Sequence, residues 1–457
     1  MAESSDPYEL KSVWLNRRLP RVENRDGDHR SAFQRDKARI LHSAAFRRLQ
    51  AKTQVLGVGL SDFYRTRLTH SLEAAQIGVG ICAQLEVKYR DECHFLELDS
   101  HLIEALCLAH DIGHPPFGHG GEIALNYMMN DAGGFEGNGQ TFRIISKLEP
   151  YTESHGMNLS RRTMLGLVKY PNFIPTLRAA NTQTASQQQT LRTIRASQWH
   201  PPKGLFESDR AIFDWLIEPF SKTDQQKFIS HNGDASVTDP KAHLRTLYKS
   251  VDCSIMELAD DIAYGVHDLE DAIVMGMVEQ SEFREMVVTP IKGLQVPWLS
   301  ENMDKLATKL FSSEHFERKN AIGALVNVFI TAIGIERVNQ FEHSLLDFNA
   351  KMPTLYATAL NTFKKYVYLK VIQKPEVQLL EYKGQQVVME LFQAFSSDPQ
   401  RLLPENTRKR WLLAEQEGDG MRVIADYISG MTDEFASRLY SNMFVPKRGG
   451  THDTLSL

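Results

Sequence analysis

Residues 106–122 read LCLAHDIGHPPFGHGGE, and the rest of the chain is organised around them. An apolar helical run leads into this stretch, and a turn rich in glycine and proline follows. Within it lie three histidines and two acids: His110, Asp111, His114, His119 and Glu122. A single histidine here would more simply belong to a helix end and a polar loop. Five ionisable groups packed this closely indicate a functional pocket, in which the adjacent His110 and Asp111 could meet one metal ion.

The flanking sequence predicts helices. Apolar residues recur at helical spacing over residues 31–50, 66–89 and 99–111. A long helix is predicted over residues 244–278, where apolar residues lie three and four apart. Alternating strand patterns are scarce, so the predicted fold class is all-α, with a helical core and additional C-terminal helices. A glycine-containing stretch near residues 53–63 leaves room for one short β-hairpin.

The length of 457 residues suggests about two to four domain-sized units. Composition and patterning predict an N-terminal arm, a catalytic core with one polar insertion, a C-terminal helical region and a tail. Their expected bounds are 1–30 for the arm, 31–290 for the core, 181–197 for the insertion, 291–445 for the C-terminal region and 446–457 for the tail.

The net charge of −5 argues against a protein that is basic all over. Its distribution is more informative, because residues 11–52 hold twelve Lys or Arg against four Asp or Glu. A local positive field beside a metal-binding core suits a polyphosphate or a nucleic acid. A solvated basic helix face would explain the same charges, and the sequence leaves both interpretations open.

Several features indicate a cytoplasmic protein that does not associate with membranes. The first residues are polar and acidic, so no secretory signal peptide is predicted. The longest apolar run, residues 321–335, is too short to span a bilayer and is predicted to be a buried helix. The four cysteines lack zinc-site spacing and lie in apolar surroundings, as expected of reduced thiols.

Two other segments offer metal ligands. His70 lies early in the helix predicted over residues 66–89. Asp260, Tyr264 and Asp268 follow one another at intervals of four on the long helix and therefore share a face, whereas Asp261 lies about 100° away. Two imidazoles and two carboxylates with open positions suit Mn, Mg, Fe, Ni or Zn. Such an ion can polarise a phosphoryl oxygen and activate water.

The arrangement His…His-Asp…Asp resembles that of the HD superfamily of metal-dependent phosphohydrolases. The surrounding sequence motifs are more specific and look like those of bacterial dGTPase-type deoxynucleoside triphosphate triphosphohydrolases. They are RTRLTHSLE at 65–73, the opening stretch from 110 to 122, FEGNGQTFR at 135–143 and ADDIAY at 259–264. The resemblance covers most of the chain, extending to SAAFRRLQAKTQV at 43–55 and DYISGMTD at 426–433.

The resemblance implies an HD-domain core that removes triphosphate intact from dGTP or another dNTP, by water attack on the α-phosphorus. It implies a divalent metal, Mn or Mg before Ni, Fe or Zn. By motif position, the metal ligands would be His70, His110, Asp111 and Asp260. His119 and Glu122 would form the acid/base pair, with Glu122 orienting His119, and His114 would contact the phosphate.

The resemblance also implies substrate-binding residues. Arg67 would bind phosphate oxygens, a task that favours a guanidinium fork. Tyr264 and Asp268 would face the sugar or the phosphate chain. Gln54 matches the position at which relatives recognise the deoxyribose 3′-hydroxyl. Asn138 is a further candidate, although it could equally close a turn. Asp268 could instead be a helix-surface charge paired with a lysine or arginine.

The family is commonly oligomeric, often hexameric, so a homo-oligomer is expected, and nucleotides or single-stranded DNA are possible effectors. Two alternatives to the dNTP triphosphohydrolase remain. One is another HD phosphohydrolase, such as a nucleotidase or a phosphodiesterase. The other is a non-catalytic HD scaffold that binds nucleotides or nucleic acid. The presence of His119 and Glu122 beside a complete ligand set favours an enzyme.

Overall fold

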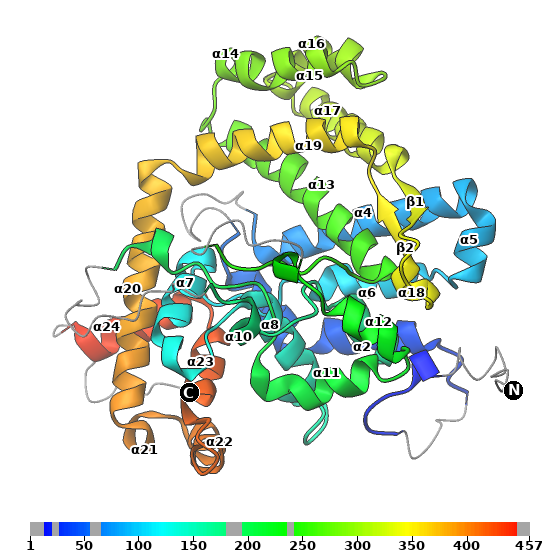
Figure 1. The fold of residues 1–457 in the computed structure, drawn as a ribbon. Coiled ribbons are helices and arrows are strands. Elements are labelled where there is room, and N and C mark those ends of the chain that lie inside the picture. Colours follow the sequence, from blue (N-terminus) through cyan, green and yellow to red (C-terminus); the bar gives the residue numbers. More distant parts are fainter. Residues whose placement is uncertain (1–12, 21–26, 55–64, 180–193, 235–241, 446–457) are drawn as a thin grey trace, which may run out of the picture.

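The computed structural model describes residues 13–20, 27–54, 65–179, 194–234 and 242–445. The first half of the chain forms short and long helices around a central helix, α13 (Figure 1). Its helices are α2 (Ala32–His42), α3 (Ala44–Arg48), α4 (Arg67–Lys88), α5 (Arg90–Phe95), α6 (Ser100–Ala109), α7 (Gly118–Met128), α8 (Gly137–Arg143), α9 (Arg161–Gly166), α10 (Ile174–Leu177), α11 (Arg210–Ile217), α12 (Lys222–Phe228) and α13 (Val251–Val274).

The second half adds further helices and one small sheet. The helices are α14 (Gln280–Phe283), α15 (Thr289–Leu294), α16 (Leu299–Leu310), α17 (His315–Ala332), α18 (Ser344–Asp347), α19 (Thr354–Val367), α20 (Pro375–Ser397), α21 (Pro399–Leu402), α22 (Glu405–Glu415), α23 (Gly420–Ser429) and α24 (Asp433–Phe444), and the strands are β1 (Gly334–Arg337) and β2 (Phe348–Lys351). The all-α prediction is therefore confirmed.

Local capping explains where the site-bearing helices begin. The Thr66 side chain accepts a hydrogen bond from the backbone of Thr69 and starts α4 close to the predicted position. Asp99 caps α6 in the same way. Ser250 caps α13, so this helix starts later than the predicted residue 244. Each cap satisfies amide groups that a helix start otherwise leaves without partners.

Two separate clusters of buried apolar side chains hold the fold together. In the first cluster α4 packs against α6 and α13, with residues such as Ile77, Leu106 and Ile262 fully buried. In the second cluster α7 packs against α20, which also contacts α23 and α24, and Leu125 and Phe392 are fully buried. Figure 1 shows α20, α23 and α24 gathered on one side of α13. The candidate site lies where these two clusters meet.

The position of the small sheet differs from the sequence-based expectation. Residues 55–63 of the predicted hairpin lie outside the described residues, and their described flanks make one antiparallel bridge, Thr53 with Thr66. The two-stranded antiparallel sheet instead pairs β1 with β2, with Gly334 opposite Lys351. The expectation of one buried helix over residues 321–335 was thus wrong at its end, because α17 stops at Ala332 and the chain turns into β1.

The described parts of the arm and of the insertion pack onto the fold. Trp14 is 6% exposed and stacks on Phe220, with ring centroids 4.9 Å apart. Arg17 forms an ion pair of 2.5 Å with the buried Asp36. Most of the predicted insertion lies outside the described residues, but Ile194, near its end, is buried in the second cluster. None of the described helices is long and apolar enough to cross a membrane.

Candidate active site

Three helices bring a potential metal-binding group together. His70 lies in the first turns of α4, His110 caps the end of α6, and Asp260 lies in the middle of α13. One ligand atom from each residue lies within 4.8 Å of the other two. Asp260 Oδ1 is 3.1 Å from His70 Nε2 and 3.4 Å from His110 Nε2. Residues 190 positions apart in the sequence thus face one point in space.

The hydrogen bonds of His110 favour metal binding over a purely structural role. Its Nδ1 lies 2.6 Å from the carbonyl oxygen of Cys107, so this nitrogen carries the proton and donates it. The Nε2 atom then presents a lone pair toward Asp260. Within the described part of the chain, this buried atom has no hydrogen-bond partner. A histidine whose second nitrogen donates to a backbone carbonyl is the usual arrangement of a metal ligand, so the donor set fits a divalent cation.

Asp111 lies beside this group and connects it to the residues that follow. Its Oδ1 is 3.4 Å from His110 Nε2 and 3.2 Å from His114 Nδ1, and its Oδ2 is 2.5 Å from Arg67 Nη1. Burial opposes ionisation of this carboxyl, but the neighbouring side chains of His114, His110 and Arg67 hold its pKa well below the usual range. Asp111 is therefore an anion that faces the metal group and holds Arg67 against it.

Lys169 lies at the same site, although the sequence did not suggest it. Its ammonium is 2.9 Å from Asp260 Oδ2, on the side of the carboxylate away from His70. Burial works against the charge of Asp260, yet Lys169 and His110 hold the pKa of that carboxyl well below its usual range. A lone lysine between α9 and α10 has no motif to mark it, so only the tertiary structure could identify it.

The second group of the site is the pair His119 and Glu122 at the start of α7. Phe117 adopts a left-handed conformation with φ of 62°, which turns the chain sharply into the helix. His119 Nδ1 then lies 3.4 Å from Glu122 Oε2. The side chain of His119 is 68% exposed and that of Glu122 only 3% exposed. A fixed buried carboxylate therefore holds one nitrogen of an imidazole whose other side remains open to a ligand.

Glu122 is itself held by a second unpredicted residue, Lys203. The Lys203 ammonium is 3.3 Å from Glu122 Oε1 and 3.1 Å from Glu136 Oε1, and the backbone amide of Gly137 donates to Glu122 at 2.8 Å. Burial opposes the charge of Glu122, but Lys203 and His119 keep the pKa of this carboxyl well below the usual range. One partly exposed lysine between two buried acids keeps both acids in place and leaves Glu122 ionised.

His114 and two of the residues predicted to face the substrate, Tyr264 and Gln54, differ in how deeply they are buried and in what surrounds them. His114 is largely buried, and its burial together with Arg67 lowers its pKa to about 4, so the ring is neutral at pH 7. Tyr264 is partly buried one turn beyond Asp260, and burial raises the pKa of its hydroxyl to about 12. Gln54 lines a cavity together with His119.

Asp268 is not the surface charge that was considered as an alternative. It is 2% exposed, and both its carboxyl oxygens are buried without a hydrogen-bond partner among the described residues. Burial raises its pKa to about 7. A carboxyl group in this state can donate or accept a hydrogen bond near neutral pH, so it can bind a hydroxyl group in either role.

The contact that Asn138 makes favours the turn-closing alternative. Its amide donates to Glu136 Oε1 at 2.7 Å, and Glu136 also caps α8 through the amide of Gly139 at 2.8 Å. Asp261 likewise points away from the metal group, because its carboxylate pairs with Lys364 Nζ at 2.5 Å. The helix-face argument that separated Asp260 from Asp261 thus agrees with their contacts.

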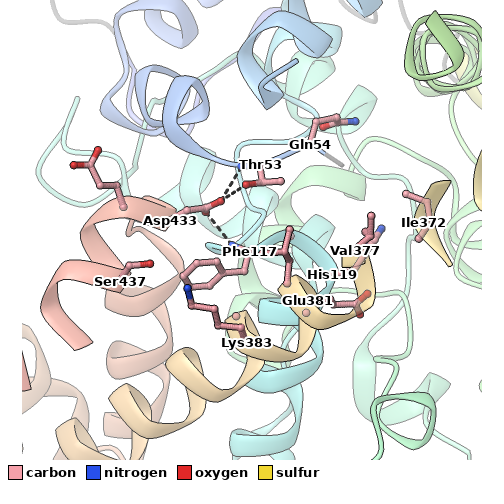
Figure 2. Close-up of a pocket in the computed structure, with 15 residues that line it drawn as sticks. Thr53, Gln54, Phe117, His119, Ile372, Val377, Glu381, Lys383, Asp433 and Ser437 are labelled. Atoms are coloured by element: carbon pink, nitrogen blue, oxygen red, sulfur yellow. Dashed lines mark hydrogen bonds between the residues drawn. The ribbon is translucent and has the colours of Figure 1, made fainter. Parts of the chain in front are cut away.

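A cavity of about 420 Å³ opens beside His119 (Figure 2). Its walls come from residues 53–54, from the start of α7, from the first half of α20 and from the start of α24. In Figure 2, Gln54 and Thr53 lie on one side of it, and His119, Val377 and Glu381 lie on the other. The cavity is large enough for a nucleobase and a sugar.

The C-terminal region is bonded directly to the loop that carries His114. Lys52 is 2% exposed, and its ammonium donates to the carbonyl oxygens of His114 at 2.6 Å and Ser429 at 2.8 Å. The Asp433 carboxylate accepts hydrogen bonds from the amides of Thr53 and Phe117, both at 2.9 Å. Residues 52 and 53 therefore join α23 and α24 to the loop between His110 and His119.

We expect Lys52→Met to loosen this junction. The substitution leaves two carbonyl groups without their donor, which should lower the free energy of unfolding by about 1–3 kcal/mol and reduce turnover. Lys88→Met is the control for loss of a carbonyl donor, because Lys88 also donates to two backbone carbonyls, those of Thr331 and Ile333, but at an exposed position far along α4. Denaturant titration and a steady-state assay would compare the two variants. Equal loss of activity in both would contradict a local role for Lys52.

The helical fold and the possible metal group agree with the class that comparison with known proteins gives, a phosphohydrolase of the HD type. Residues 67–166 match the model of the HD domain, and residues 350–442 match the model of the phosphohydrolase-associated domain. The HD match includes His110, Asp111, His114, His119 and Glu122 of the opening stretch, whereas Asp260 lies beyond it.

Curated relatives extend the match over nearly the whole chain. The deoxyguanosinetriphosphate triphosphohydrolase-like protein of Shewanella sp. strain ANA-3 is 60% identical over 439 residues, covering 96% of this chain and 97% of the relative. The protein of the same name from Shewanella loihica is 57% identical over 443 residues, with 97% and 99% covered. The chain belongs to the deoxyguanosinetriphosphate triphosphohydrolase-like family of the HD superfamily.

Proposed function

We propose that this protein hydrolyses dGTP or other dNTPs to a deoxynucleoside and inorganic triphosphate, with a divalent metal as cofactor. The observation that carries the proposal is the convergence of His70, His110 and Asp260 beside the His119–Glu122 pair and an adjoining cavity. The names of the curated relatives support the substrate class. A metal site with a purely structural role would need His70, His110 and Asp260, but it would need neither the His119–Glu122 pair nor the adjoining cavity.

The metal, Mn or Mg before Ni, Fe or Zn, would be held by His70, His110, Asp111 and Asp260. When bound, it would polarise a phosphoryl oxygen and make a water molecule more acidic. The mixed nitrogen and oxygen donors of the four residues suit such an ion. The buried and unmatched Nε2 of His110 supports this assignment.

Proton transfer falls to His119. Attack of water on the α-phosphorus breaks the bond to the 5′-oxygen of the nucleoside, so one proton must leave the water and one must reach that oxygen. An imidazole open on one side can exchange protons with either group near neutral pH. Glu122, ionised and buried, would hold Nδ1 of His119 and keep the ring in one orientation.

Positive and neutral donors would hold the phosphates. Arg67 presents a guanidinium beside Asp111, and Lys169 and Lys203 lie beside Asp260 and Glu122. A triphosphate entering between these residues would meet three cations in a chain whose net charge is −5. His114 would donate to phosphate, and Gln54, Tyr264 and Asp268 would contact the sugar or phosphates.

The cavity beside His119 would receive the base. Gly120 allows α20 to approach closely, since a Cβ there would lie 2.7 Å from the carbonyl oxygen of Glu381. The Glu381 carboxylate thus stands at the cavity wall (Figure 2). Guanine carries two neighbouring N–H donors on its Watson–Crick edge, which a carboxylate can accept together, whereas adenine presents only one.

Glu381→Gln should therefore lower kcat/KM for dGTP about 10-fold to 100-fold and change kcat/KM for dATP much less. The expected loss corresponds to about 1.5–3 kcal/mol for a hydrogen bond to a charged group. Glu376→Gln, at an exposed position on the same helix, is the control. Competition between dGTP and dATP in one reaction measures the ratio directly. An equal loss for both substrates would remove Glu381 from base selection.

A product assay tests the proposal as a whole. The four dNTPs and GTP are incubated with Mn and with Mg, and the products are separated by chromatography. Inorganic triphosphate with a deoxynucleoside supports the proposal. Orthophosphate, or a linearised monophosphate from a cyclic nucleotide, would indicate another HD phosphohydrolase. Binding without turnover across these substrates and metals would indicate a nucleotide-binding scaffold.

Three further assignments belong to this proposal. A homo-oligomer, hexameric in the implied family, is supported by strongly exposed apolar side chains such as Leu379 on α20 and Leu413 on α22, each 68% exposed. A cytoplasmic location is supported by four free cysteines that are all buried. Nucleotide or single-stranded DNA effectors are supported by the excess of basic residues between positions 11 and 52.

A further inference from the structure

The turn that leads into α7 has a backbone conformation that few residue types adopt. Phe117 has a φ of 62° and Gly118 a φ of 56°, so two consecutive residues are left-handed. Glycine adopts this conformation freely, but for a bulky residue such as phenylalanine it is strained. Strain of this kind persists only where the surrounding structure holds the residue, and it concentrates at functional sites. His119 follows two positions later, so the contacts that hold Phe117 also determine where the His119 ring lies.

Two helices of the C-terminal region hold Phe117. The Asp433 carboxylate, in the first turn of α24, accepts a hydrogen bond from the Phe117 amide through Oδ1 at 2.9 Å. The Phe117 side chain packs against α20, where a Cβ on Gly384 would lie 2.6 Å from its Cγ atom, so only glycine allows this close approach. Phe117 lies within the residues that match the HD domain, whereas Asp433 and Gly384 lie within the match of the phosphohydrolase-associated domain. The second domain match thus supplies the contacts that fix a turn of the first.

The same carboxylate also binds the other side of the cavity beside His119. Asp433 Oδ2 accepts hydrogen bonds from the backbone amide of Thr53 at 2.9 Å and from the Thr53 hydroxyl. Thr53 precedes Gln54, and Gln54 and His119 line the same cavity. Figure 2 shows the Asp433 carboxylate bonded to both Thr53 and Phe117. One carboxylate therefore holds the two sides of the cavity in a single arrangement.

A role in capping α24 does not explain these contacts. The cap of α24 is Thr432, whose side chain accepts a hydrogen bond from the Phe435 amide at 3.2 Å. Asp433 is 6% exposed, and its carboxylate accepts three hydrogen bonds from residues outside the helix. Burying a carboxylate costs free energy, and a helix start that Thr432 already caps does not require that cost. The contacts of Asp433 therefore serve Phe117 and Thr53 rather than α24 itself.

We propose that Asp433 is a positioning residue, which holds the strained turn at Phe117 and thereby places His119 opposite Gln54 across the cavity. Asp433 exchanges no proton with the substrate and acts through the backbone of Phe117 and Thr53. The role of the phosphohydrolase-associated part of the chain is then to set the position of the proton-transfer residue. The effect of Asp433 on turnover rests on the proposed function, in which His119 transfers protons, whereas its hold on the turn does not.

Hydrogen exchange at the Phe117 amide tests the proposal without any substrate. Pro115 and Pro116 have no amide proton, so a short peptide from this turn reports mainly on Phe117 and its next neighbours. We expect Asp433→Ala to speed exchange of this amide about 10-fold or more, because it removes a hydrogen bond to a charged group. Thr432→Ala is the matched control, since it removes the cap of α24 but no acceptor of Phe117, and it should leave this exchange rate unchanged.

Steady-state kinetics with dGTP on the same variants measure the consequence for turnover. Asp433→Ala should lower kcat up to about 100-fold, the loss that a displacement of about 1 Å can cause, while metal content stays that of the unsubstituted chain. The fall in kcat should exceed any rise in KM, because Gln54 and Glu381 are retained. Asp433→Asn keeps one oxygen acceptor and should recover part of the lost kcat. Thr432→Ala should keep its kcat although its unfolding temperature falls.

Two outcomes would overturn the proposal. One is an unchanged exchange rate at Phe117 in Asp433→Ala, and the other is an equal loss of kcat in Asp433→Ala and Thr432→Ala. If Asp433→Ala does not fold, judged by thermal unfolding, Asp433→Asn replaces it in both measurements, and the same comparison with Thr432→Ala decides. An unsubstituted chain that hydrolyses no dNTP would refute the proposed function alone, and faster exchange in the Asp433 variant would still support the hold of Asp433 on the turn.

Discussion

His119→Ala is expected to reduce turnover of dNTPs about 100-fold to 10,000-fold while metal content stays near that of the unsubstituted chain. This range is the usual contribution of a positioned general acid or base. The side chain is 68% exposed, lies on α7 and does not belong to the three residues that form the metal group, so its loss should leave those residues in place. Steady-state kinetics and metal analysis on the same preparation measure both quantities.

Two companion variants sharpen this test. Glu122→Gln keeps the shape of the carboxyl but removes its charge, so turnover should fall less than in His119→Ala and the pH profile should shift. His94→Ala removes an exposed histidine on α5 and should leave both turnover and metal content unchanged. Turnover by His119→Ala at the rate of the unsubstituted chain would exclude His119 from proton transfer.

Asp260→Ala should abolish stable metal binding, whereas the neighbouring Asp261→Ala should retain it. Asp260 faces His70 and His110, while Asp261 faces Lys364 on another side of α13. Loss of even an outer partner of a ligand weakens metal binding about 10-fold to 100-fold, so loss of a ligand should exceed that range. Metal content after dialysis, read by elemental analysis, distinguishes the two variants.

A structural side effect has to be separated from metal loss. Asp260 also neutralises Lys169, and removal of one partner of a buried ion pair costs about 3–5 kcal/mol. Asp260→Asn preserves the volume and one hydrogen-bond acceptor, so it should fold better than Asp260→Ala and still lose metal. If Asp261→Ala loses metal and the Asp260 variants keep it, the assignment of helix faces is wrong.

The parts of the site that could be predicted from the sequence depend on short-range geometry. His110, Asp111, His119 and Glu122 lie within one stretch, and the face shared by Asp260 and Asp268 follows from helical periodicity alone. The long helices could be predicted for the same reason, since their apolar spacing repeats over several turns. Their starts were less certain, because the cap at Ser250 outweighs the apolar pattern that begins before it.

The parts that could not be predicted depend on tertiary contacts. Lys169 and Lys203 are isolated lysines in connecting segments, and only the folded chain places them against Asp260 and Glu122. The strands β1 and β2 have four residues each, too few for an alternating pattern to show. The sequence could not predict that Asp268 is buried, for a similar reason. Helical spacing gives the side of the helix on which a side chain lies, but not the element that packs over that side.

The division of the buried side chains into two clusters makes the catalytic arrangement less robust than either of its halves. The first cluster surrounds α4, α6 and α13, and the second includes Ile123, Ala124 and Leu125 of α7. Apolar clusters of this kind tend to open as separate cooperative units. Opening of the second unit alone would carry His119 and Glu122 away from His70, His110 and Asp260, which belong to helices of the first. We therefore expect thermal inactivation of this protein to begin as a sub-global event, with turnover lost at a lower temperature than the capacity to bind metal.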